Sequence, residues 1–344
     1  MKPNDLAYYL SGFLTKYLPG EIGASNNTIA SYRDTFVLLL EFYKNEKQIV
    51  AEHLTLSIIS KVDIEEFLGW LETDRKCKVS TRNVRLASLH SFFRYLQYEN
   101  PDHLNEWQRI LSIPVKRAPK GSLSYASLDG VKLLLSMPDL ETKSGRRDLA
   151  LLSLMYDTAA RVQEIIDLTP SDIRFEKPCT IKITGKGNKV RIVPLLESQI
   201  KILKGYMVES DLLEPYAGKY PLFPNKSKNK LTRAGVSYIL RKYVELARTN
   251  DEALIPEKFS CHCLRHSKAM HLLQAGVNLI YIRDILGHSS VQTTEIYARV
   301  DSKKKREAIE SAYSQIVPES VPIWQTSDSL LKWLKEFNKN DNAK

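Results

Sequence analysis

The chain has 344 residues, 43% of them hydrophobic and 26% charged, and a formal net charge of +10. Its length favours more than one domain, and its basic excess suits a polyanionic partner, although a basic protein without such a partner would carry the same charge. Four scattered cysteines in a chain long enough to hold a core favour a reduced protein over a disulfide-stabilised fold. No apolar run could span a membrane and no signal-peptide layout opens the chain, so we expect a cytoplasmic protein.

The first hundred residues predict a small helical bundle. Apolar residues recur with helical spacing over 6–18, 29–44, 62–72 and 80–98. No stretch alternates in the manner of a strand. Pro101 is expected to end this unit, and residues 113–124 (IPVKRAPKGSLS) have the composition of an extended, cationic linker. We therefore place a domain boundary near Pro119.

Basic and hydroxyl side chains gather where the last of these helices begins, and further basic residues follow in the linker. Such groups at a helix N-terminus suit contacts with a phosphate backbone. By themselves they are better explained as a solvated surface face, and it is their position within the whole chain that favours DNA. The candidate DNA contacts in this region are Lys76, Lys78, Thr81, Arg82, Arg85, Lys116, Arg117 and Lys120.

The remainder predicts helices interrupted by a small antiparallel sheet. Helical spacing covers 127–136, 146–156 and 158–168. Two runs rich in Ile, Val and Thr, at 180–184 and 189–194, flank GKGN and indicate a β-hairpin whose turn uses positive φ. Further helices are expected over 199–207 and 232–247. The second of them adds three candidate phosphate contacts, Arg233, Arg241 and Lys242.

Residues 261–300 concentrate side chains suited to phosphate chemistry on a helical scaffold. His262, Arg265 and His288 can donate hydrogen bonds to phosphate oxygens, and the phenol of Tyr297 can form a covalent intermediate. Each also has an ordinary interpretation, Tyr297 as a core aromatic and His288 as a turn residue.

Three polar residues earlier in the chain belong to the same pattern. Arg161 beside a buried helix is costly unless it is paired or faces a cleft, and Glu164, one turn later, can orient it. Lys186 at the hairpin tip can reach into a cleft. Alone, these residues would be a structural ion pair and an exposed lysine.

Neither a nucleotide site nor a metal site is predicted. The GKGNK segment lacks the spacing of a P-loop, and no carboxylates cluster in a way that would hold Mg²⁺. Cys261, His262 and Cys263 can be interpreted as metal ligands, but structural zinc takes four ligands at wider spacing.

Taken in order, these segments resemble the tyrosine recombinases, a family that includes the Xer-type recombinases and transposon integrases. The resemblance covers residues 28–313. The matching boxes are 158–168, 185–187, 262–266 and 286–290, the last followed by Tyr297. The family commonly has glycine where Ala159 stands, and we expect only a tolerated packing change there.

The resemblance implies a phosphate clamp. Arg161 and Arg265 would bind the non-bridging oxygens of a scissile DNA phosphate and stabilise the charge of the transition state. His288 would donate a further hydrogen bond, and Glu164 would support Arg161.

It also implies the covalent chemistry. Tyr297 would attack phosphorus to give a 3′-phosphotyrosyl link, and Lys186 would protonate the departing 5′-oxygen. His262 would assist Tyr297 as base or hydrogen-bond partner. Because the covalent link conserves the phosphodiester energy, no ATP, metal or other cofactor is expected.

The implied fold is mainly α with a small antiparallel β-sheet. A helical, SAM-like core DNA-binding domain with its basic linker would span 1–118, and a mixed α/β catalytic domain would span 119–317. Together they would close on double-stranded DNA as a C-shaped clamp. An amphipathic tail helix over 327–337, within a segment 318–344, would dock on a neighbouring protomer or on its own body.

The function implied is site-specific DNA recombination or integration, with a mobile-element transposase preferred to chromosome-dimer resolution. Exchange between two duplexes implies a homotetramer, with no membrane partner and no small-molecule substrate. A type IB topoisomerase and a non-catalytic DNA-binding protein on the same fold are the alternatives. The compact helical N-terminal domain favours recombination, and the presence of every box argues against an inactive protein.

Overall fold

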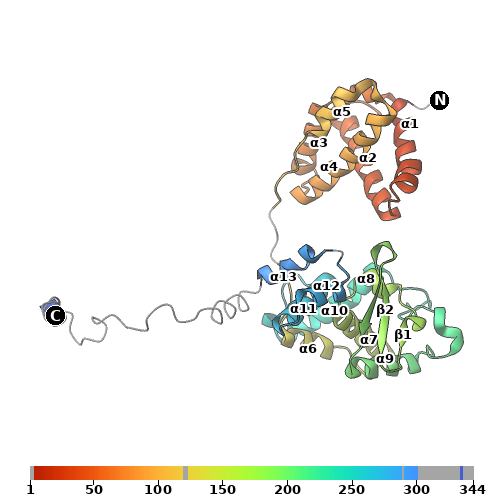
Figure 1. The fold of residues 1–344 in the computed structure, drawn as a ribbon, viewed down its shortest axis with the longest axis vertical. Coiled ribbons are helices and arrows are strands. Elements are labelled where there is room, and N and C mark those ends of the chain that lie inside the picture. Colours follow the sequence, from red (N-terminus) through yellow and green to blue (C-terminus); the bar gives the residue numbers. More distant parts are fainter. Residues whose placement is uncertain (1–3, 119–122, 289, 301–333, 336–344) are drawn as a thin grey trace, which may run out of the picture. The chain divides into compact units, whose positions relative to one another are not determined.

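The computed structural model describes residues 4–118, 123–288, 290–300 and 334–335. Its contacts divide the chain into two compact units, Met1–Gly121 and Ser122–Lys344 (Figure 1). The expected tail helix over 327–337 lies outside the described residues, apart from Leu334 and Lys335, which are helical. None of the described helices combines the length and apolar character of a membrane span.

The first unit is the helical bundle that the sequence predicts, with one helix more. Its α-helices are α1 (Asp5–Gly12), α2 (Asn26–Glu46), α3 (Lys61–Thr73), α4 (Val79–Glu99) and α5 (Leu104–Leu111); a π-helix (Phe13–Glu21) continues α1. The sequence did not predict α5, because we expected Pro101 to end the helical unit. Pro101 instead opens a short 3₁₀ turn (Pro101–His103), where proline is tolerated.

Aromatic side chains fill the centre of this bundle. Phe13, Phe36 and Phe92 are buried, and the ring of Phe92 lies 5.0 Å from that of Phe36 and 5.2 Å from that of Phe13. Edge-to-face contacts of this kind stabilise a core beyond the area that they bury. Trp107 of α5 closes the bundle, since it is fully buried and its Nε1 donates to the carbonyl of Asn100.

The second unit is also mainly helical and carries one small sheet. Its helices are α6 (Leu128–Ser136), α7 (Lys143–Thr158), α8 (Val162–Ile166), α9 (Glu197–Glu209), α10 (Arg233–Asn250), α11 (Cys261–Gln274), α12 (Leu279–Leu286) and α13 (Glu295–Val300). The strands β1 (Ile173–Arg174), β2 (Thr180–Thr184) and β3 (Val190–Pro194) pair antiparallel in the order β1-β2-β3. This confirms the predicted fold class.

The predicted hairpin is present, and its turn has the expected backbone. Thr184 pairs with Val190, and Gly187 and Asn188 have φ of 74° and 56°. Ile181 and Ile183 of β2 and Val193 of β3 are buried in the core, and the opposite, exposed face carries Lys182 together with Ile192. The hairpin tip at 185–189 is thereby fixed by the register of the sheet.

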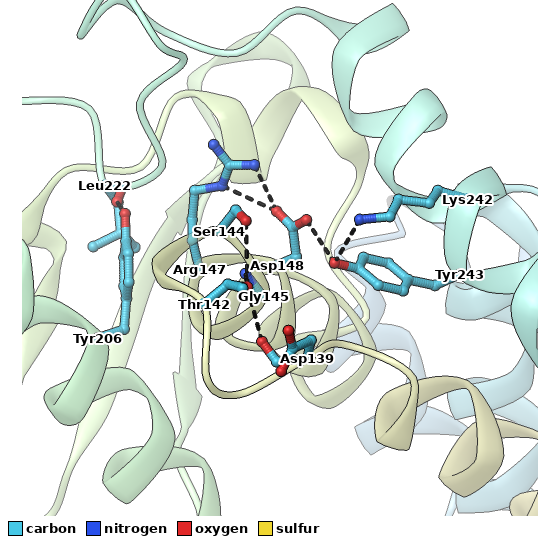
Figure 2. A network of polar contacts seen from close by, with 10 residues as sticks. All are labelled: Asp139, Thr142, Ser144, Gly145, Arg147, Asp148, Tyr206, Leu222, Lys242 and Tyr243. Carbon is cyan, nitrogen blue, oxygen red and sulfur yellow. Dashed lines mark hydrogen bonds and ion pairs between the residues drawn. The ribbon is translucent and has the colours of Figure 1, made fainter.

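A buried carboxylate of α7 accepts a hydrogen bond from α10 (Figure 2). Asp148 of α7 is almost fully buried; Arg147 donates to its Oδ1 at 2.7 Å, and the hydroxyl of Tyr243 donates to its Oδ2 at 2.9 Å. Both carboxylate oxygens therefore have donors, as a buried charge requires. At the start of α7, Gly145 has no room for a side chain, since an added Cβ would lie 1.8 Å from the carbonyl oxygen of Asp139.

Candidate active site

One cavity of about 810 Å³ in the second unit is lined by part of the predicted catalytic set. Arg161, Gly287 and His288 line it, and so do Gly185 and Gly187, which flank Lys186 at the hairpin tip. The side chain of Lys186 lies outside the described part of the chain. The backbone nevertheless places the residue at the rim, as the resemblance implies.

A break between α7 and α8 positions Arg161. The sequence predicts one helical stripe over 158–168, but α7 ends at Thr158 and Ala159 has left-handed backbone angles of φ 48° and ψ 31°. Arg161 consequently becomes the N-cap of α8. Its backbone N–H donates to Glu164 Oε2 at 2.9 Å, and its Nη1 donates to Glu164 Oε1 at 2.8 Å.

Glu164 is a buried carboxylate that holds two guanidinium groups. Arg191 of β3 donates to its Oε2 at 2.6 Å, in addition to the two bonds from Arg161. Burial by itself would raise the pKa of Glu164, but the bonds from Arg191 and Arg161 outweigh it and leave the pKa below its ordinary value. Glu164 is therefore charged at neutral pH, in agreement with its predicted supporting role.

Arg265 of α11 is held between the ends of two helices. It is 4% exposed, and it donates to the carbonyl of Ala159 at 2.7 Å and to that of Leu286 at 2.6 Å. These carbonyls lie at the C-terminal ends of α7 and α12, where a cation is favourable. Burial, together with the nearby charge of Arg161, lowers the pKa of Arg265 to about 10, so the group stays protonated at neutral pH.

Ala159 shapes this arrangement through its backbone, beyond the packing change that we expected. Left-handed angles cost a residue with a Cβ roughly 1–2 kcal/mol more than they cost glycine. We predict that Ala159→Gly raises the free energy of unfolding by up to about 1 kcal/mol, because part of the gain is lost with the buried methyl group. Urea titration of both proteins measures this; a variant less stable than the parent would contradict it.

His288 is half-buried and lines the same cavity. Its Nδ1 is 3.0 Å from the hydroxyl of Thr294, which is fully buried. Burial, with the charges of Arg265 and Arg161, lowers the pKa of His288 to about 4. The imidazole is thus neutral at pH 7, and with Nδ1 bound to Thr294 it has Nε2 left for a ligand.

Tyr297 of α13 is 1% exposed and shares a small apolar cluster with Ala159, Met270 and Leu286. Its hydroxyl lies 2.9 Å from Nδ1 of His266. Burial raises the pKa of Tyr297, against the opposing effect of Arg265 and Arg161, and burial lowers the pKa of His266 to about 4. In this state the proton therefore stays on the phenol.

The histidine beside Tyr297 differs from the one that we expected. We predicted His262 as the base or hydrogen-bond partner, whereas the partner is His266, one helical turn later on the same face of α11. His262 is exposed and lines a second cavity of about 390 Å³ together with Arg161 and Arg233. The two imidazole rings are 6.3 Å apart.

The low pKa of His288 has a consequence for stability. As pH falls below about 6.5, the unfolded chain binds a proton that the folded chain takes up only near pH 4, so the folded state loses stability across this window. We predict that His288→Asn weakens the decline in unfolding free energy between pH 6.5 and 4. Urea titrations at several pH values measure the two slopes, and equal slopes would refute the prediction.

Two residues that we predicted to contact DNA, Arg82 and Arg85, are not exposed on the surface. Arg82 is 5% exposed, and its Nη1 donates to the carbonyl of Pro114 at 3.2 Å. Arg85 is half-buried and donates to the carbonyl of Ser31 at 2.9 Å, which ties α4 to α2. Both belong to the interior because they lie one helical turn before core leucines of α4.

The other predicted contacts have varied surroundings. Lys120 is outside the described residues, and Lys116 pairs with Glu72. Arg233 donates to Gln163 Oε1 at 2.8 Å, and the ammonium of Lys242 lies 4.7 Å from the ring of Tyr243. The remaining residues are exposed: Lys76, Lys78, Thr81, Arg117 and Arg241.

Sequence reasoning missed Arg191, Thr294 and the role of His266. A signal for Arg191 exists, because it shares its strand face with the buried Val193, where a charged residue needs a partner. Thr294 and His266 carry no comparable signal. Within the described ranges, no group of three or more His, Cys, Asp or Glu residues could hold a metal ion.

Comparisons with known proteins give matches to both units of the chain. The Phage integrase family matches residues 127–304, and the N-terminal SAM-like domain of phage integrases matches residues 12–100. A putative integrase/recombinase, y4rC, of Sinorhizobium fredii is 37% identical over 90% of this chain and 92% of its own length. Tyrosine recombinase XerC of Syntrophus aciditrophicus is 33% identical over 83% of this chain and 91% of its own length.

Solved structures show the same architecture. XerH site-specific recombinase bound to its difH substrate has a TM-score of 0.65 and 26% identity, covering 87% of this chain and 84% of that one. Tn1549 transposon integrase bound to a circular intermediate DNA has a TM-score of 0.69 at 17% identity, covering 88% and 99%. With both units matched by family models and the relatives covered along nearly their whole length, the chain belongs to the phage integrase family of tyrosine recombinases.

Proposed function

We propose that this protein is a site-specific DNA recombinase that cuts and rejoins DNA through a 3′-phosphotyrosyl intermediate. The observation that carries the proposal is that Arg161 and His288 line one cavity, while Arg265 and Tyr297 are buried next to residues of the same site. Arg265 donates to the carbonyls of Ala159 and Leu286, and the Tyr297 hydroxyl lies beside His266. Two guanidinium groups and a neutral imidazole suit a phosphodiester whose negative charge grows in the transition state. The membership of the family and the DNA complexes of its solved relatives support the same substrate.

The reaction proceeds in two balanced steps. The Tyr297 oxygen forms a bond to phosphorus, the bond from phosphorus to the 5′-oxygen breaks, and the phenolic proton is lost while the 5′-oxygen gains one. His266 is placed to take the phenolic proton, and Lys186 is the residue assigned to protonate the 5′-oxygen. In the second step, the 5′-hydroxyl of another strand attacks phosphorus, the bond from phosphorus to Tyr297 breaks, and the phenol regains its proton.

Tyr297 is buried in the DNA-free chain, so cleavage requires it to leave the apolar cluster or the cluster to open when DNA binds. We propose that the first unit and its basic linker also bind the duplex, and that four protomers assemble on two duplexes. The exposed basic residues, Lys76, Lys78, Arg117 and Arg241, are assigned to the phosphate backbone with Thr81, Lys116, Arg233 and Lys242. Insertion or excision of a mobile element is the task that we assign to this activity.

The test uses duplexes of randomised sequence, each nicked near the middle of one strand. Cleavage close to the nick releases a short fragment that diffuses away, which traps the covalent complex for capture and sequencing. We expect a DNA strand attached to Tyr297 and a preferred sequence among the captured strands. A duplex of that sequence should then exchange strands with a second duplex; relaxation of supercoiled DNA without exchange would indicate a topoisomerase, and no covalent complex would refute the proposal.

A further inference from the structure

Arg191 brings a third guanidinium group to the active site. Its side chain is 11% exposed, its Nη2 donates to Glu164 Oε2 at 2.6 Å, and it lines the cavity with Arg161 and His288. Its Nε is buried and has no hydrogen-bond partner among the described residues. No step of the proposed reaction uses this charge, although burying it without a purpose is costly.

The carboxylate of Glu164 is divided between the two arginines. Oε1 accepts from Nη1 of Arg161, and Oε2 accepts from Nη2 of Arg191 and from the backbone N–H of Arg161. A guanidinium group facing a free carboxylate can take both oxygens in a two-bond fork. Arg191 occupies the oxygen that such a fork with Arg161 would need. The Nη2 of Arg161 is left with one long contact, 3.5 Å to the carbonyl of Gly287.

Two glycines make room for this pair. An added Cβ at Gly287 would lie 2.9 Å from Nη1 of Arg191, and one at Gly185 would lie 2.9 Å from Oε1 of Glu164. Gly185 belongs to the hairpin that carries Lys186, and Gly287 immediately precedes His288. The Arg191–Glu164 pair is therefore packed against both loops that border the cavity.

Arg191 also changes the charge of the site. Arg191 adds its positive charge to those of Arg161 and Arg265, and Glu164 offsets one of the three. A pentacoordinate phosphorane carries two negative charges, one more than the phosphodiester. The positive charge of Arg191 therefore favours the more highly charged transition state over the bound substrate.

We propose that Arg191 is a positioning residue, which holds one oxygen of Glu164 so that Arg161 stays directed at the scissile phosphate. This inference rests on the proposed function. Without Arg191, Glu164 would draw both terminal nitrogens of Arg161 away from the cavity. DNA binding would survive, because most of its affinity comes from contacts elsewhere, and the cleavage step would slow.

The experiment compares Arg191→Gln, Glu164→Gln and the double variant on the nicked duplex selected by capture with the parent protein. Single-turnover formation of the covalent complex gives the rate, and a gel-shift titration gives Kd. We expect Arg191→Gln to slow cleavage about 10- to 100-fold with Kd changed by less than about threefold. In the Glu164→Gln background, Arg191→Gln should slow cleavage less than about twofold, because the two residues act as a unit.

Two further variants complete the design. Arg191→Lys keeps the charge and one donor, so it should recover part of the rate. Arg146→Gln breaks a comparable pair with Glu209, remote from the cavity, and should leave the rate unchanged.

The outcomes separate the two proposals. No covalent complex with the parent protein would refute the proposed function itself. If the parent reacts, an unchanged rate in Arg191→Gln, or an equal loss with and without Glu164, would overturn the positioning role alone. Circular dichroism checks folding; should Arg191→Gln be unfolded, Arg191→Lys decides by the same comparison, since a rate equal to that of the parent would overturn the inference.

Discussion

Tyr297→Phe is expected to form no covalent complex with a nicked duplex, a loss of at least about 10⁴-fold in rate, since the attacking oxygen is gone. The variant should still fold, because phenylalanine fills the same apolar cluster. It loses the bond to His266, which costs about 1 kcal/mol of unfolding free energy. A gel under denaturing conditions measures the covalent complex, and a gel shift should show duplex binding similar to that of the parent protein.

Tyr156→Phe is a matched control for this result. Tyr156 lies in the same unit, and its hydroxyl bonds to Nδ1 of His271 at 2.8 Å, much as Tyr297 bonds to His266. Removing the Tyr156 hydroxyl should lower the free energy of unfolding by a similar amount and leave covalent attachment to DNA intact. Covalent attachment by Tyr297→Phe would show that another residue is the nucleophile, and loss of attachment in both variants would point to stability rather than chemistry.

Arg265→Gln is expected to lower both the cleavage rate and the stability. The rate should fall about 10²- to 10³-fold, the usual effect of removing a donor that stabilises transition-state charge. The buried carbonyls of Ala159 and Leu286 would also lose a charged donor, which costs about 1–3 kcal/mol for each acceptor left unpaired. Single-turnover cleavage and urea titration measure the two effects separately.

Arg265→Lys distinguishes the structural from the chemical part. An ammonium group can satisfy a carbonyl, so the stability should recover in part. It cannot bind two oxygens in a planar fork, so the cleavage rate should stay low. A lysine variant that recovers rate and stability together would mean that Arg265 acts only by holding the ends of α7 and α12.

Sequence patterns were sufficient for the fold wherever one face of an element is buried. The core leucines and phenylalanines of α4 and the alternation of β2 and β3 follow directly from periods of 3.6 and 2. The same reasoning, applied consistently, would have corrected Arg82 and Arg85, which precede Leu86 and Leu89 by four residues. Their position at the start of the helix suggested that they are exposed, whereas the side of the helix on which they lie makes them buried.

The break at Ala159 could not be predicted in this way. The apolar pattern runs on from α7 into α8, and alanine is a strong helix former. What ends α7 is tertiary: the carbonyl of Ala159 accepts from Arg265 of α11, and Glu164 caps the start of α8. Likewise, the choice between His262 and His266 depends on how the chain after α12 brings Tyr297 back to α11, and both histidines face the same side.

The bonds of Arg265 also set an order in time during protein synthesis. Arg265 donates to Ala159, which is made 106 residues earlier, and to Leu286, which is made 21 residues later. When α7 leaves the ribosome, neither the guanidinium group nor the tyrosine that it serves exists. A nascent or prematurely terminated chain that lacks α12 and α13 therefore lacks Leu286 and Tyr297, and under the function that we propose it cannot cleave DNA.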